Sequence, residues 1–268
     1  MSAPVIDLRG VRCVVAGRAV LDVPRLVIMP GERVALVGAN GAGKSTLLRL
    51  VGGFVPTATG AVAVLGESLP CAPNRLRALR NRVGHMLQQL HLVSRLSARE
   101  NVLIGLLGRR RGWRTWLRWP DAADRCAADA ALSRVGIAAL ADVRVDRLSG
   151  GERQKVAVAR MLLQAPELVL ADEPTAALDP QATDDICTQL VALAADATLI
   201  VAVHNPALLP RLATRVIGLA HGAIVFDLPT AQVDAGRLSA LYAGHPAAMG
   251  DAAALFNATA ATWTEQPA

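Results

Sequence analysis

A chain of 268 residues, 53% of them apolar, is long enough for one or two domains with a sizeable core, which excludes a mainly disordered protein. Its 28 basic and 22 acidic residues give a formal net charge of +6. That charge suits nucleic acid or an anionic membrane surface but does not choose between them. Because the only lysines are Lys44 and Lys155, the many arginines, with the many alanines, look like codon bias and are discounted as functional evidence.

Four cysteines, Cys13, Cys71, Cys126 and Cys187, lie more than fifty positions apart along the sequence. This spacing predicts no zinc or cluster site, and a reducing compartment is expected. The sequence shows no charged-then-apolar leader, and no apolar run reaches the ~18–20 residues that cross a bilayer. A soluble chain that is not embedded in the membrane is therefore expected.

The first predicted elements are strands. Residues 8–29 alternate loosely between apolar and polar side chains, with turn signals at Ala16-Gly17 and Pro30-Gly31, and they predict an antiparallel strand group. Residues 33–37 form a short, continuous apolar run. Such a run is typical of a strand buried on both faces of a largely parallel sheet.

A glycine-rich loop follows this run and precedes a helical pattern that carries Leu47, Leu48 and Val51. The loop satisfies the Walker A pattern with Gly38, Ala39, Asn40, Gly41, Ala42, Gly43, Lys44, Ser45 and Thr46. In this pattern backbone amides at a helix N-terminus surround phosphate oxygens, the lysine reaches the β- and γ-phosphates, and the serine hydroxyl binds Mg²⁺. The loop predicts binding of a nucleoside triphosphate with Mg²⁺.

The middle of the chain, from about Leu90 to Leu163, has mainly helical periodicity and predicts a helical subdomain inserted into the sheet domain. One apolar face is expected to end at a stop at Gly136. Its members are Cys126, Ala127, Ala131, Leu132 and Val135.

Residues 148–154 begin with a capping box, in which Ser149 is the N-cap and Glu152 lies three positions later. The box accounts for the start of a helix but leaves Gly150 and Gly151 unexplained. Two glycines expose the amides at a helix N-terminus, so they predict a second anion site.

An acidic pair, Asp172-Glu173, follows the apolar run at residues 168–171, at the carboxyl edge of the predicted sheet. Asp172 suits the Mg²⁺ shell, and Glu173 suits polarising a water molecule. Such a pair can also merely cap the next element. In the company of the phosphate-binding loop, hydrolysis is the better account.

The last regular elements complete an α/β pattern. Asp179 is the predicted N-cap of a helix with Pro180 in its first turn and an apolar stripe of Ile186, Leu190 and Leu193. Another buried strand is predicted at residues 198–203. The sequence becomes alanine-rich after Asp227, and a loosely held tail is expected beyond Gly244.

From about Ile6 to Asp227 the chain resembles the ATP-binding subunits of ABC transporters, because the motifs of that family occur in order. By this resemblance Gly38–Thr46 is the Walker A loop, Gln88 the Q-loop glutamine, Leu148–Gln154 the signature, Leu168–Glu173 the Walker B strand, Ala177–Asp179 the D-loop and His204 the switch histidine. The resemblance implies a P-loop NTPase sheet core, an antiparallel β subdomain and an inserted helical subdomain. The implied boundaries are 1–88 with 164–230 for the nucleotide-binding core, 89–163 for the helical subdomain and 231–268 for a C-terminal helix and tail.

In this family the signature of one subunit completes the nucleotide site of the other. The resemblance therefore implies a homodimer in which each ATP lies between one Walker A loop and the signature of the second copy. The signature residues implied to act in this way are Ser149, Gly150, Gly151 and Glu152.

The resemblance also assigns roles in hydrolysis. Glu173 would be the general base, and His204 would hold the γ-phosphate and the water. Gln88 would join Ser45 and Asp172 around Mg²⁺ and sense the membrane partner. Asp179 would link the two sites.

The implied partners are two integral-membrane permease subunits and, indirectly, a substrate-binding protein, at the cytoplasmic face of the inner membrane; no nucleic acid is expected. Several segments resemble the phosphonate importer ATPases in particular, which implies phosphonate or a related phosphorus oxyanion as cargo. They are residues 88–97, 101–105 and 107–109 with Trp113-Arg114, residues 171–174, and residues 215–219 with 222–227. Because the ATPase never touches the cargo, this inference rests on kinship, and phosphate, amino acid or lipoprotein systems are alternatives.

Two positions depart from the family pattern. Val15 stands where an aromatic residue often stacks on adenine, which puts nucleotide selectivity in doubt, and Asn205 stands where an acidic residue is frequent. Neither departure removes a catalytic group.

Three tryptophans, Trp113, Trp116 and Trp119, recur among five arginines between residues 109 and 118. They could stack nucleobases, lie at a membrane interface, dock a cytoplasmic loop of the permease or belong to a solvated basic loop. The docking role is slightly favoured, and these residues are not assigned to the site.

Two functions of other classes fit the sequence less well. A non-transport ABC ATPase acting on DNA or ribosomes usually carries two cassettes, a long coiled coil or zinc motifs, which this sequence does not show. In a P-loop kinase or switch protein, the pattern at residues 149–154 would occur only by chance. The transporter function is therefore favoured.

Overall fold

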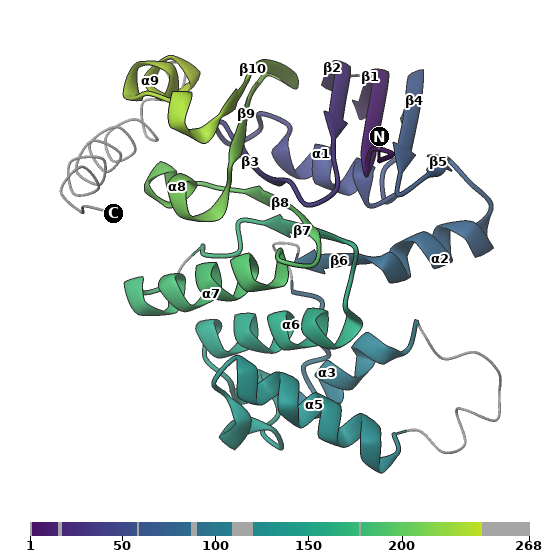
Figure 1. The fold of residues 1–268 in the computed structure, drawn as a ribbon, viewed down its shortest axis with the longest axis vertical. Helices are drawn as coiled ribbons and strands as arrows, with labels where there is room; N and C mark the ends of the chain where they lie inside the picture. The colour runs from purple at the N-terminus through teal and green to yellow at the C-terminus, as the bar shows by residue number, and fades with distance from the viewer. Residues whose placement is uncertain are drawn as a thin grey trace. The chain divides into compact units, whose positions relative to one another are not determined.

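The structure is a computed structural model that describes residues 2–15, 18–57, 59–86, 90–108, 120–176 and 178–242 (Figure 1). The chain forms two compact units. The terminal unit contains residues Met1–Cys71 and Thr198–Ala268, and the central unit contains residues Ala72–Ala197. The three-part division implied by the family resemblance stays a prediction.

The terminal unit is built on one sheet. Its strands are β1 (Ile6–Val15), β2 (Arg18–Ile28), β3 (Arg33–Val37), β4 (Thr59–Val64), β5 (Glu67–Leu69), β8 (Thr198–Ala202), β9 (Arg215–Ala220) and β10 (Ala223–Pro229). Their order across the sheet is β5-β4-β1-β2-β10-β9-β3-β8. Strand β1 pairs antiparallel with both β2 and β4, which confirms the antiparallel group predicted for residues 8–29.

Strand β3 lies between β8 and β9 and runs parallel to both. Four of its five residues, Val34 to Val37, are buried, as expected for a strand covered on both faces. Helix α1 (Lys44–Val51) follows the loop after β3. The helical elements η4 (Pro206–Leu208), α8 (Leu209–Leu212), η5 (Thr230–Gln232) and α9 (Ala235–Tyr242) also belong to this unit.

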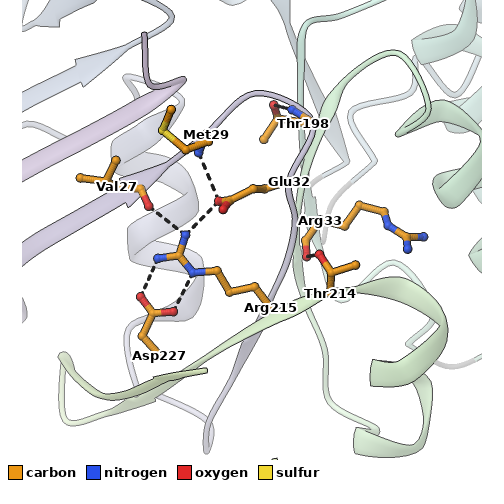
Figure 2. A network of polar contacts seen from close by, with 9 residues as sticks. Val27, Met29, Glu32, Arg33, Thr198, Thr214, Arg215 and Asp227 are labelled. Carbon is orange, nitrogen blue, oxygen red and sulfur yellow. Dashed lines mark hydrogen bonds and ion pairs between the residues drawn. The ribbon is translucent and has the colours of Figure 1, made fainter. Parts of the chain in front are cut away.

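A polar network holds the beginning of β3 (Figure 2). The Arg215 guanidinium on β9 donates to both carboxylate oxygens of Asp227 on β10, at 2.7 and 2.6 Å. It also donates to the Val27 carbonyl on β2 and to Glu32, each at 2.9 Å. The same Glu32 oxygen accepts from the Met29 amide at 3.1 Å. One side chain thus ties three strands to the turn that precedes β3, at the end opposite the phosphate-binding loop.

The central unit combines two parallel strands with helices. Its elements are α2 (Pro73–Arg82), β6 (Val83–Met86), α3 (Ala98–Leu103), η1 (Ile104–Leu106), α5 (Ala122–Arg134), η2 (Ala138–Leu140), η3 (Val145–Arg147), α6 (Gly150–Gln164), β7 (Leu168–Asp172) and α7 (Pro180–Leu193). Strand β6 pairs with β7 in parallel. Helices α3, α5 and α6 pack against one another and form the predicted helical region (Figure 1).

The apolar face predicted for α5 is wrong in part. Cys126 and Ala127 are exposed, whereas Asp124 and Ala128 are buried together with the predicted Ala131, Leu132 and Val135. The helix begins at a capping box between Asp121 and Asp124. Alanines occur on every side of it, so the sequence contains little information about which side faces the core.

No helix in the described part of the chain is long and apolar enough to span a membrane. The tryptophan and arginine segment at residues 109–119, the tail beyond Gly244 and Gln88 lie outside the described residues.

Candidate functional site

The loop after β3 has the backbone that its glycines predict. Gly38, Gly41 and Gly43 have φ angles of +150°, +81° and +106°, which favour glycine. A Cβ on Gly38 would lie 2.2 Å from the Leu219 carbonyl oxygen on β9, so a side chain there is excluded. Helix α1 begins at Lys44, and the loop amides therefore precede a helix N-terminus, as an anion site requires.

The turn between β9 and β10 supports this loop from one side. The Gly222 amide donates to the Ala42 carbonyl at 3.0 Å, and the Gly222 carbonyl accepts from the Asp22 amide at 2.7 Å. A Cβ on Gly43 would lie 3.3 Å from the Gly222 Cα. Two glycines thus allow the close approach of two backbone segments.

Lys44 is 4% exposed, and its Nζ donates to the carbonyls of Gly38 at 2.7 Å and Ala39 at 3.2 Å. Its ammonium group therefore lies along the inside of the loop, where a phosphate would find a positive charge together with backbone amides.

Tyr242 is a contact of the loop that the sequence did not predict. The Gly38 amide donates to the Tyr242 hydroxyl at 3.3 Å, and the tyrosine is 2% exposed at the end of α9. Gly38 therefore contacts Tyr242 through its amide and Lys44 through its carbonyl. The only signal in the sequence was that this is the sole tyrosine of the chain.

We expect Tyr242→Phe to weaken ATP binding about threefold to tenfold, because a neutral hydrogen bond contributes about 1 kcal/mol and the Gly38 amide would lose its partner. Equilibrium titration with a fluorescent ATP analogue measures the change. The control is Thr230→Val, which removes a 2.7 Å hydrogen bond to the Ala213 carbonyl in the same unit. Equal ATP affinity in Tyr242→Phe and the control variant would contradict a role for Tyr242 in positioning the loop.

His204 lies at the same sheet edge as the loop. The Val203 amide donates to the Leu36 carbonyl at 3.0 Å, so β8 and β3 end side by side, and the exposed His204 follows directly. Asn205 caps η4 by accepting from the Ala207 amide at 3.0 Å. This cap gives the departure from the family pattern a structural reason, since asparagine and aspartate both serve as N-caps.

The acidic pair ends β7 in the central unit. Asp172 is 2% exposed, and neither of its carboxylate oxygens has a hydrogen-bond partner among the described residues. A buried carboxylate without a partner is costly, so its oxygens fit a hard cation such as Mg²⁺. Glu173 has a φ of +50°, a left-handed backbone conformation that is uncommon for a non-glycine residue.

The signature forms the predicted capping box at the start of α6. The Glu152 amide donates to the Ser149 hydroxyl at 3.3 Å, and the Ser149 amide donates to the Glu152 carboxylate at 2.7 Å. The hydrogen bonds from Ser149 lower the pKa of the Glu152 carboxyl group below its usual value. The box thus holds the first turn of α6 with its amides facing outward.

No described residue packs closely enough against the two signature glycines to require glycine there. A Cβ on Gly150 meets no heavy atom within 4 Å in the described structure, and a Cβ on Gly151 would make only ordinary contacts, the nearest at 3.4 Å with Ala182. Glycine in a helix costs roughly 0.5–1 kcal/mol relative to alanine. The described residues thus leave space for a ligand at the N-terminus of α6.

Asp179, the D-loop aspartate, is the N-cap of α7 and accepts from the Ala182 amide at 2.9 Å. The terminal unit thus contains the Walker A residues and His204. The central unit contains Asp172, Glu173, Asp179 and the signature. Strand β6 ends at Met86, which pairs with Ala171, the residue before Asp172.

Comparison with known proteins identifies the family. The family described as ABC transporter matches residues 21–176, more than half of the chain. The chain belongs to the ABC transporter family. It is accordingly an ATP-hydrolysing enzyme with the fold of an ATP-binding cassette.

Two curated members of the family are similar over most of this chain. It is 44% identical to the phosphonates import ATP-binding protein PhnC of Anaeromyxobacter dehalogenans over 89% of the chain and 48% of that protein. The chain thus spans about half the length of this relative. It is 38% identical to the hypophosphite import ATP-binding protein HtxD of Stutzerimonas stutzeri over 88% of the chain and 70% of that protein.

A solved ABC cassette shares the fold. The dimeric post-hydrolysis cassette MJ0796, bound to ADP and inorganic phosphate, has a TM-score of 0.75 and 28% identity, covering 84% of this chain and 98% of that one. This similarity confirms the predicted cassette architecture.

Proposed function

We propose that the chain is the ATP-hydrolysing subunit of an importer for a phosphorus oxyanion and that it works as a homodimer. The observation that carries the dimer is the open space at Gly150 and the lack of a packing reason for Gly151. A helix N-terminus where the described residues leave room for a Cβ at Gly150 suits the γ-phosphate of an ATP held by a second copy. The cassette MJ0796 is dimeric with bound ADP and phosphate, which supports this arrangement.

Within each site the chain's residues would divide the work of hydrolysis. Residues 38–46 would hold the triphosphate, with Lys44 on the β- and γ-phosphates. Ser45, Asp172 and Gln88 would hold Mg²⁺, for which the unpartnered oxygens of Asp172 are the supporting observation. When bound, Mg²⁺ supplies positive charge to the phosphate oxygens.

The proton of the attacking water would pass to Glu173. Its carboxylate directly follows the buried strand β7 and is not enclosed by the chain, so it can face a water molecule in line with the γ-phosphate. His204 would keep the γ-phosphate and the water in position. Asp179, at the N-terminus of α7, would connect the two sites of the dimer.

We infer that the dimer binds two permease subunits and lies peripherally at the cytoplasmic face of the inner membrane, where a substrate-binding protein delivers the cargo to the permease. The names of the two curated relatives, importers of phosphonates and of hypophosphite, support a phosphorus oxyanion as cargo. No cargo pocket is required in this chain, since the permease and the binding protein carry that specificity.

Growth on single phosphorus sources tests the cargo. We expect a strain that lacks this gene to lose growth on methylphosphonate or hypophosphite and to keep growth on inorganic phosphate. The wild-type gene should restore growth, and the Glu173→Gln gene should not. Undiminished growth of the deletion strain on both compounds would show that the cargo is another one.

A further inference from the structure

The central unit contains a cavity of about 260 Å³ that hydrolysis does not use. It lies among the end of α2, strand β6, η1 and the C-terminal half of α6. Five of the residues that line it carry polar side chains: Arg80, Asn81, His85, Arg160 and Gln164. No acidic residue lines this cavity, as far as the structure describes it.

Arg160 is the unusual member of this set. Its Nη1 donates to the His91 carbonyl at 3.0 Å and its Nη2 to the Leu90 carbonyl at 2.9 Å. Burial lowers the pKa of the Arg160 guanidinium. Residues 2–242, apart from the undescribed gaps, offer it no carboxylate.

Two other arginines with little exposure have the carboxylate partners that Arg160 lacks in the described structure. Arg99 pairs with Asp129 and Asp142, and Arg215 pairs with Asp227 and Glu32. Each of these guanidinium groups therefore has two carboxylates. A largely buried cation that has only neutral acceptors is costly unless an anion joins it.

The lowered pKa of His85 indicates the sign of the electrostatic potential in the cavity. Its pKa is lowered to about 4. Burial is the largest cause, and the charges of Arg80, His91 and Arg160 act in the same direction. Every charge in this set acts in the same direction, so the cavity has a positive potential. His85 itself is neutral near pH 7 and can only contribute a hydrogen bond.

The two amides form the wall of the cavity. Asn81 Nδ2 donates to the Gly108 carbonyl at 2.9 Å, and Gln164 Nε2 donates to the Val83 carbonyl at 2.9 Å. Both amides thus donate to backbone carbonyls, and the positive charges of the lining belong to Arg80 and Arg160. The volume holds a tetrahedral anion together with a few waters, since one water occupies about 30 Å³ in the liquid.

We propose that this cavity binds a small tetrahedral oxyanion, such as inorganic phosphate or a short alkylphosphonate, between Arg80 and Arg160. Guanidinium groups bind phosphate oxygens in charge-assisted, often bidentate hydrogen bonds. The site is separate from the phosphate-binding loop and does not rest on the proposed cargo. Arg160 also donates hydrogen bonds to the carbonyls of Leu90 and His91, which follow Gln88 in the chain. An anion bound to Arg160 would therefore contact the side chain that holds these two carbonyls.

Isothermal titration of the full chain with inorganic phosphate, and in a second arm with methylphosphonate, tests the site. The Lys44→Ala background removes the main charge of the phosphate-binding loop, so that any remaining binding belongs elsewhere. We expect saturable binding of one anion per chain, weakened about tenfold or more by Arg80→Gln or Arg160→Gln. Arg77→Gln is the matched control, since Arg77 is exposed on α2 and does not line the cavity.

The proposal is overturned if neither anion binds in a saturable way, or if Arg80→Gln binds as well as Arg77→Gln. Binding of an acidic peptide without binding of either free anion would also overturn it and would assign the positive potential to a protein partner. If Arg160→Gln does not fold, Arg80→Gln decides the question, because Arg80 also lines the cavity and this variant keeps the hydrogen bonds of Arg160 to the Leu90 and His91 carbonyls. Growth on phosphonate is not a readout here, so failure of this site leaves the proposed function untouched.

Discussion

Glu173→Gln is expected to lower ATP turnover by about 10²–10⁴-fold, the range typical for loss of a general acid or base. Glutamine has nearly the same shape as glutamate but cannot accept the proton of the attacking water. The variant does not alter residues 38–46, proposed to hold the triphosphate, or Asp172, proposed to hold Mg²⁺, so ATP should still bind. A dimer that binds ATP without hydrolysing it should therefore accumulate.

Two measurements check this result: steady-state phosphate release, and light scattering during gel filtration with MgATP. Glu167→Gln is a suitable control, since Glu167 lies just before the same strand and makes a surface ion pair with Arg82. Its turnover should stay close to that of the wild type. Near-normal turnover in Glu173→Gln would contradict the general-base role, and a monomer at saturating ATP would contradict the composite site.

The parts of the site that were predicted from sequence are those specified by local chemistry. The backbone angles at Gly38, Gly41 and Gly43 follow from a short glycine pattern, and the capping box at Ser149 and the N-cap at Asp179 follow from residues three positions apart. Such features need no knowledge of distant parts of the chain. They therefore appear in the structure where they were predicted.

Features that depend on distant residues were not predicted. The contact between Gly38 and Tyr242 joins positions 204 residues apart, and the Arg215 network joins β2 to β9 across 188 residues. Neither spacing is visible in a single sequence. The partly wrong apolar face of α5 has a different cause, because its alanines occur on every side of the helix and mark no single apolar face.

The glycine at position 150 allows folding and activity to be separated. We expect Gly150→Ala to leave the free energy of unfolding unchanged or to raise it by up to about 1 kcal/mol, since alanine favours a helix and the new methyl group meets open space. Turnover should nevertheless fall by about 10²-fold. The methyl group would stand between the amides of α6 and the γ-phosphate held by the second copy, and loss of such donors has an effect of this size.

Gly136 is the matched control for this prediction, because a Cβ there also meets no heavy atom within 4 Å but the residue has a φ of +74°. Gly136→Ala should therefore destabilise the fold by roughly 1 kcal/mol through backbone strain while the folded protein keeps its turnover. Chemical denaturation measures the free energy of unfolding of each variant, and an ATPase assay measures its turnover. If the two alanines affect stability and turnover in parallel, the space beside Gly150 is not reserved for a nucleotide. Opposite patterns in the two variants would mean that the signature glycine acts on ATP rather than on the fold of its own chain.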